Sequence, residues 1–208
     1  MPAPILANAQ KIAPNPSVNT FIVSPLVAWS LFRAAWHRGI LGAIAREADP
    51  VPNLPVLLAD YGVYHCDPRN RLTHYFGVPA IAYAVLIPAA LHTVTMFGFA
   101  VGIDRIIVAA FVLFYLSLDL RLGLALAVLL GLLAWAAEAT TRLGVSGSIA
   151  LAGVIFFFGW VLQLLGHHLQ GNRPALLTNL FQIVVAPIYL TAELGFALGL
   201  RASLRAEV

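Results

Sequence analysis

Cysteine and charged residues are both scarce in this chain of 208 residues. Cys66 is the one cysteine, so an intrachain disulfide and a zinc site built on several thiolates are excluded. Only 10% of the residues are charged and 61% are hydrophobic, whereas soluble domains carry about 25% charged residues. The 12 basic residues form no dense cluster, which argues against nucleic acid as a partner. The composition predicts an integral membrane protein.

Five apolar runs follow one another along the chain. A helix that spans a bilayer needs roughly 20 residues, and three of the runs reach or approach that length. The two short runs are separated only by residues 119–121, so they form either two short helices in a tight hairpin or one broken segment near the surface. We interpret them as two short helices. The expected fold is an all-α, polytopic membrane bundle of about five membrane helices. The runs cover residues 78–102, 106–118, 122–137, 149–165 and 176–200.

The N-terminal part differs from the rest in pattern. Residues 21–45 are apolar but carry Arg33, His37 and Arg38, which favours an amphipathic helix at the membrane interface over a spanning one. Prolines at 50, 52 and 55 then interrupt any helix. We therefore expect an N-terminal extension, 1–55, followed by a membrane-embedded domain, 56–208.

Four of the six histidines fall in two short polar segments: His65 and His74 in the first, His167 and His168 in the second. If every run crosses the membrane, both segments lie on one side. Most of the basic residues lie there too, so the positive-inside tendency predicts a cytoplasmic face, which in a bacterium means the inner membrane. The basic residues expected on the opposite side are Arg105, Arg142, Arg201 and Arg205.

Histidines gathered on one face can bind a metal, because neutral imidazole is the commonest protein ligand for iron, copper, nickel and zinc. Gln163 and His167 share a helix face at i,i+4, whereas His168 points about 100° away, so His167 is the better inward candidate. Alternatively, the histidines pack at helix ends at the level of the lipid headgroups. His92 is expected to be a hydrogen-bonded residue inside the bundle.

Other polar residues near these segments have two interpretations each. Arg173 precedes the last apolar run, where it can bind a carboxylate or phosphate or simply anchor the helix. The last run carries a polar stripe that should face the bundle. Glu193 in that stripe is expected about 20 Å beyond Asn179, too deep for a metal ligand and therefore structural. The stripe consists of Asn179, Gln182, Ala186, Tyr189 and Glu193.

The two histidine segments together resemble the small membrane 2-hydroxy fatty acid dioxygenases, typified by the fungal enzyme of phytosphingosine alpha-oxidation. The similarity runs from about Leu58 to Gly195. The first matching set is Tyr64, His65, Pro68, Asn70, His74 and Pro79. The second set is Gly159, Trp160, Gln163, Gly166, His167, Arg173, Pro174, Ala175, Leu176, Asn179, Leu180, Gln182, Ala186 and Pro187.

The resemblance implies an Fe(II)-dependent enzyme that uses molecular oxygen to shorten a 2-hydroxy fatty acid by one carbon, with the acyl chain in or beside the membrane lipid. It implies iron ligands at His65, His74 and His167, with His168 as a possible fourth. The other implied catalytic residues are Arg173, which would hold the carboxylate, Asn70 or Gln163, which would orient a ligand ring, and Tyr64.

One segment departs from the family pattern. An acidic residue commonly follows the second histidine motif in the family, whereas Gln170, Gly171 and Asn172 stand here, which puts the ligand set in question. Two other classes stay open: a haem-binding electron carrier with two axial histidines, and a metal-free lipid-binding protein. Di-iron membrane hydroxylases need more histidines than the six present. The sequence leaves the oligomeric state open.

Overall fold

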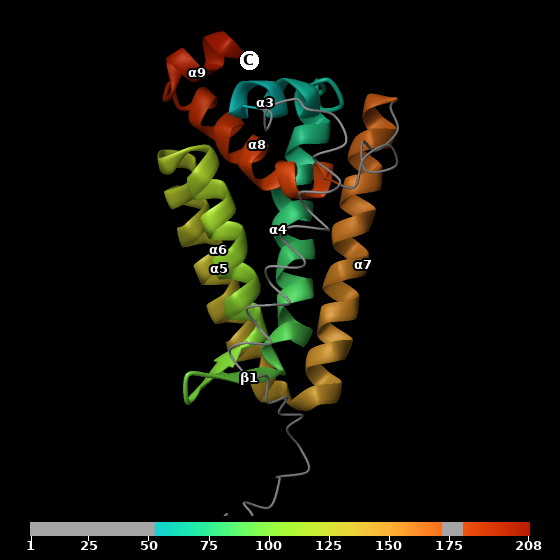
Figure 1. Ribbon diagram of the computed structural model, residues 1–208. Helices are drawn as coiled ribbons and strands as arrows, with labels where there is room; N and C mark the ends of the chain where they lie inside the picture. Colours follow the sequence, from blue (N-terminus) through green and yellow to red (C-terminus); the bar gives the residue numbers. More distant parts are fainter. Residues whose placement is uncertain (1–52, 172–180) are drawn as a thin grey trace, which may run out of the picture.

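The computed structural model describes residues 53–171 and 181–208 and shows an all-α protein with one small β-hairpin (Figure 1). The expected interfacial helix at residues 21–45 lies outside the described residues, as do Arg173 and Asn179, so the division at residue 55 stays a prediction. The elements are α3 (Leu54–Gly62), α4 (Pro68–Ala90), β1 (Thr93–Met96), β2 (Phe99–Gly102), α5 (Ile103–Leu118), α6 (Leu120–Thr140), η2 (Thr141–Leu143), α7 (Gly144–Gln170), α8 (Gln182–Ala197) and α9 (Ala202–Glu207).

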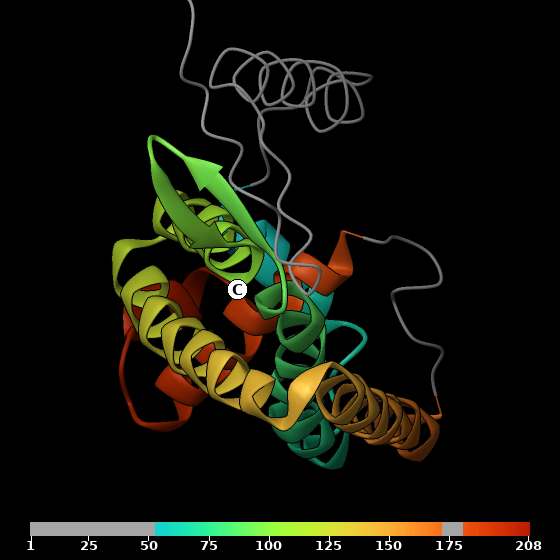
Figure 2. The same cartoon turned by 90° about the horizontal axis from the view of Figure 1, so that it is seen from below.

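Helix α4 is the central element of the bundle. Helix α7 packs along its length, and the antiparallel pair α5 and α6 packs on its other side (Figure 1). Helices α3 and α8 lie across one end, and the β-hairpin projects from the other end beside α5 (Figure 2). We call the end with α3 and α8 the histidine end, because the residues described below gather there.

Helix α4 begins at a strong cap and ends earlier than hydropathy predicts. The side chain of Asp67 accepts a hydrogen bond from the amide of Arg69 at 2.8 Å, and Pro68 occupies the first helical position. The helix ends at Ala90, so the expectation of one span over residues 78–102 is wrong. The β-branched residues at 93–95 favour a strand, and Phe97 and Gly98 turn the chain with positive φ angles of 52° and 84°.

The two short apolar runs are two helices, as predicted. Helix α5 ends at Leu118, and the carboxylate of Asp119 caps α6 by accepting hydrogen bonds from the amides of Arg121 and Leu122, each at 2.9 Å. Asp119 also forms an ion pair with Arg201, which follows α8. Arg201 therefore lies at the histidine end, not on the opposite side as the crossing count predicted, because α8 lies across the bundle instead of traversing it.

Glycines bring α4 and α7 close together near the histidine end. A Cβ atom at Gly159 would lie 2.7 Å from Cγ1 of Ile81, and one at Gly166 would overlap Thr73 Oγ1 and Asn70 Oδ1. Only a residue without a side chain fits these positions. Gly166 directly precedes His167, so this close approach also carries His167 toward α4.

Two helical stretches are long and apolar enough to cross a membrane: Pro68–Ala90, and Leu120–Gln170, which contains α6, η2 and α7. In an apolar window of 18 residues within each stretch, only 28% and 22% are buried inside the protein. Most of that apolar surface therefore faces outward, as membrane association requires. Exposed side chains include Trp135 at 70% and Phe157 at 63%. The expected count of about five membrane helices is not confirmed.

Candidate metal centre and adjoining cavity

Three histidines from three different elements meet at the histidine end. His65 lies in the turn between α3 and α4, His74 in the second turn of α4, and His167 in the last turn of α7. Their side chains are 1%, 3% and 5% exposed, and one ring nitrogen of each lies within 4.8 Å of the others. The sequence prediction that the two polar segments lie together is confirmed.

His65 is held on two sides by α3. Its Nδ1–H donates to the carbonyl oxygen of Tyr61 at 2.8 Å, and the two rings stack with centroids 4.0 Å apart and planes 2° from parallel. Burial lowers the pKa of His65 to about 3, although the hydrogen bond to Tyr61 opposes the shift. His65 is therefore neutral at physiological pH, which is the form that binds a metal.

The ring of His74 is fixed in the same way. Its Nδ1–H donates to the carbonyl oxygen of Asn70 one turn earlier, at 2.9 Å. With both Nδ1 atoms donating, the Nε2 atoms of neutral His65 and His74 carry lone pairs, and these two atoms face each other at 3.2 Å. Two acceptors without a proton between them repel, so the arrangement is suited to a cation that both can coordinate.

His167 completes the group. Its ring lies 5.0 Å from the ring of His65 and 5.0 Å from that of His74, centroid to centroid. Its Nδ1 is buried and has no hydrogen-bond partner among the described residues. Three neutral imidazoles with unpaired nitrogens and no thiolate suit a borderline transition metal such as iron or zinc. The residues present therefore fit a metal ion.

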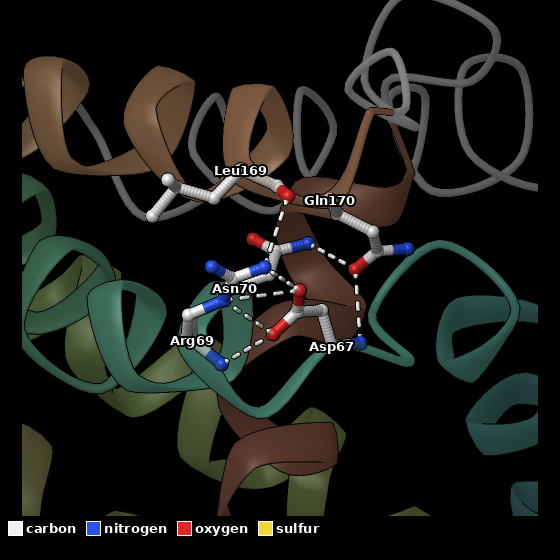
Figure 3. A network of polar contacts seen from close by, with 5 residues as sticks. All are labelled: Asp67, Arg69, Asn70, Leu169 and Gln170. Carbon is white, nitrogen blue, oxygen red and sulfur yellow. Dashed lines mark hydrogen bonds and ion pairs between the residues drawn. The ribbon is translucent and has the colours of Figure 1, made fainter.

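Asn70 joins α4 to the end of α7 (Figure 3). Its side-chain amide donates to Oε1 of Gln170 at 2.7 Å and to the carbonyl oxygen of Tyr64 at 3.1 Å. Gln170 Oε1 also accepts from the amide of Asp67 at 3.2 Å. Asn70 thus positions His74 through its carbonyl group and α7 through its side chain. Tyr64 takes part through its backbone carbonyl.

The remaining candidate residues lie in different surroundings. Gln163 is buried beside the cluster, and its Oε1 has no partner among the described residues. His168 is exposed on the other face of α7 and lies outside the cluster. The expectation of a buried His92 is wrong, because α4 ends at Ala90 and His92 is exposed in the turn before the hairpin.

Of three residues around His65, the sequence analysis missed Tyr61 and Arg71 and named Tyr189 only as part of the polar stripe in the last apolar run. Tyr61 and Tyr189 both lie against its ring, Tyr189 at 5.8 Å between centroids. Arg71 donates to the carbonyl oxygen of His65 at 3.4 Å and forms an ion pair with Glu193 at 3.5 Å. The prediction that Glu193 lies deep in the bundle is wrong, because α8 crosses the histidine end. The i,i+4 spacing of Tyr61 and His65 was the one available signal.

A cavity of about 240 Å³ begins at the three histidines and continues into the bundle between α4, α5, α7 and α8. Its walls are almost entirely apolar. The polar side chains near its histidine end include Gln163 and Gln182, and the Oε1 atoms of both are buried without a partner among the described residues. An amphiphilic ligand with a polar head and a long apolar tail suits this shape.

The fold and the site define a class of all-helical proteins in which three buried histidines, able to hold a metal ion, stand above an apolar cavity. The family model described as "2-hydroxy-palmitic acid dioxygenase Mpo1-like" matches residues 53–198. The 2-hydroxy-palmitic acid dioxygenase MPO1 of Saccharomyces cerevisiae is 34% identical over 153 residues, which are 73% of this chain and 84% of the yeast protein. No solved structure matches the chain. The chain belongs to the Mpo1-like family.

Proposed function

We propose that the protein is an Fe(II)-dependent dioxygenase that shortens 2-hydroxy fatty acids by one carbon, with His65, His74 and His167 as the iron ligands. The facing Nε2 atoms of His65 and His74, 3.2 Å apart in a buried site, carry the proposal. The name of the yeast relative supplies the substrate class and the reaction type. Zinc fits the same ligands but has no redox chemistry, so a reaction with oxygen favours iron.

The iron would supply the redox chemistry for the reaction with oxygen, and the protein's own residues would supply orientation and exclusion of water. The carbonyl groups of Tyr61 and Asn70 fix both histidine rings with their Nε2 atoms turned toward the metal position. Gln163 and Gln182 offer carboxamide oxygens without a partner among the described residues to the polar head of the substrate. Arg173 stays the proposed carboxylate-binding residue and His168 a possible fourth ligand, although His168 is exposed here.

We further propose that the bundle lies in a membrane with its histidine end toward the cytoplasm, in a bacterium at the inner membrane. Arg69, Arg71, Arg121 and Arg201 all belong to that end, whereas Arg105 and Arg142 lie toward the hairpin end. This distribution agrees with the positive-inside tendency. Membrane lipid and the acyl chain of the substrate would then share one apolar environment.

A haem held between His65 and His74 conflicts with the distance between their ring nitrogens. Axial ligands bind from opposite sides of the haem plane, which places their nitrogens about 4 Å apart at metal–nitrogen bonds of about 2.0 Å. The Nε2 atoms of His65 and His74 are 3.2 Å apart, and the two rings meet edge to face at 77°. This geometry leaves no room for a porphyrin between them.

Metal analysis of anaerobically purified protein tests the proposal, together with oxygen uptake on 2-hydroxypalmitate. We expect close to one iron per chain and oxygen consumption that depends on Fe(II) and is not restored by Zn(II). Palmitate, which lacks the 2-hydroxyl group, is the matched control and should be inert. Protein that binds fatty acid but holds no metal and consumes no oxygen would support the lipid-binding alternative instead.

A further inference from the structure

The cavity below the histidines follows one face of α4. His74, Val78 and Ala82 lie on successive turns of this face, and Leu86 follows one turn later. All four line the cavity, and Val78, Ala82 and Leu86 present only hydrocarbon. The cavity therefore continues the metal centre as an apolar channel along α4.

Two buried leucines lie at the far end of the channel. Leu86 is the cavity-lining residue of α4 that lies farthest from His74, and Leu130 lines the cavity from α6. They are only 4% and 8% exposed. Twelve residues separate His74 from Leu86, which corresponds to about 18 Å of helix rise. An extended hydrocarbon advances about 1.25 Å per carbon, from a bond of about 1.52 Å and an angle near 111°. The channel therefore accommodates about 14 carbons beyond the group at the histidines.

The side of the channel reaches the surface of the bundle. Val85 on α4 and Phe111 on α5 both line the cavity and are 47% and 38% exposed. Both lie on apolar helices, so the opening faces the surface that would contact lipid. An alkyl chain can enter the channel from the apolar surface of the bundle at this point.

We propose that this channel binds the alkyl chain of the substrate, with carbons 1 and 2 at the histidines and the methyl end against Leu86 and Leu130, and that Ala82 and Leu86 set the preferred chain length. The inference rests on the proposed function for the identity of the polar head. It goes further by assigning the acyl-binding site and the residues that limit chain length. The two head carbons plus about 14 in the channel give about 16 carbons, the length of the palmitic acid in the name of the yeast relative.

The first test narrows the channel halfway. Ala82 lies about 12 Å below His74 along α4. Ala82→Phe should therefore block chains that extend more than about ten carbons beyond the group at the histidines. We expect at least a tenfold loss of kcat/KM for 2-hydroxypalmitate and less than a twofold loss for 2-hydroxyoctanoate. Ala109→Phe is the matched control, because Ala109 is exposed on α5 and does not line the cavity. Equal loss for both chain lengths in a folded Ala82→Phe protein, or the same profile in Ala109→Phe, would refute the proposed channel.

The second test uses the unaltered protein and does not depend on turnover. A 2-hydroxy fatty acid of 16 carbons with a diazirine near its methyl end is photolysed on the full-length protein under anaerobic conditions, and the labelled residues are mapped by mass spectrometry. We expect labelling near Leu86, Ile107 and Leu130, which excess 2-hydroxypalmitate suppresses. Labelling confined to outward-facing residues such as Leu132 and Trp135 would overturn the proposal. If the channel is labelled but no 2-hydroxy acid is oxidised, the proposed function fails while the acyl site stands.

Discussion

Replacement of Gly166 by alanine tests the link between helix packing and the metal centre. The added Cβ would overlap Thr73 Oγ1 and Asn70 Oδ1 and lie 3.2 Å from the Asn70 carbonyl oxygen. Thr73 can rotate away at the cost of its hydrogen bond to Asn70, but Asn70 is fully buried and held by two hydrogen bonds. Helix α7 must therefore move away from α4, and it carries His167 with it.

The expected cost follows from that displacement. Overpacking of a close contact destabilises a protein by about 1–3 kcal/mol. A shift of about 1 Å at a catalytic group can lower activity by about 100-fold. We therefore expect Gly166→Ala to remain folded, with a lower Tm in detergent, weakened iron retention and about 1% of the oxygen uptake on 2-hydroxypalmitate.

Gly153→Ala is the matched control on the same helix. A Cβ at Gly153 meets nothing within 4 Å, and alanine favours a helix interior over glycine by about 0.5–1 kcal/mol. This variant should keep its iron and activity and have an equal or higher Tm. The reasoning would be refuted if Gly166→Ala retained full iron affinity and activity, or if both glycine variants lost them equally.

Three further predictions concern the ligands, the pH dependence and Gln170. Alanine at any one of the proposed ligands His65, His74 and His167 should abolish iron retention measured by elemental analysis, whereas alanine at the exposed His92 should leave it intact. The low pKa of His65 means that the unfolded chain takes up a proton below pH 6.5 that the folded chain does not. Metal-free protein should therefore lose stability as the pH falls from 6.5, and His65 alone should lower the free energy of unfolding by about 2 kcal/mol at pH 5. In His65→Gln, Tm should depend less on pH over this range. Gln170→Glu should keep its iron, because only Oε1 of Gln170 accepts hydrogen bonds, whereas Gln170→Ala should weaken iron retention.

Much of the site was predictable because it depends on local sequence periodicity. Counting the apolar runs brought the two polar segments to one end, and the i,i+4 relation of Gln163 to His167 distinguished the inward histidine from His168. The interruption of the apolar runs at residues 119–121 marked the break between α5 and α6. The last two signals act within a few residues, and the count of apolar runs depends only on their order along the chain.

The errors arose where an apolar run was equated with a complete crossing. Hydropathy is the same for a helix that continues and for a hairpin of Thr93 to Gly102, so it missed the end of α4 at Ala90. Hydropathy also contains no information on how a helix is tilted in the bundle. Helix α8 lies across the histidine end, which brought Tyr189 and Glu193 next to His65 and Arg71 and placed Arg201 against Asp119. The spacing showed that Tyr189 and Glu193 share one polar helix face, but the partners of that face depend on tertiary packing.

The departure at Gln170 can now be judged from its contacts. A metal ligand at this position would have to reach the three histidines, but Gln170 Oε1 is engaged by the side chain of Asn70 and the amide of Asp67. Both partners donate, so the position requires an acceptor oxygen and no negative charge. A carboxamide and a carboxylate satisfy that requirement equally. The residue fastens the end of α7 to the start of α4, one turn from His74, so the departure at Gln170 removes no ligand from the proposed three-histidine set.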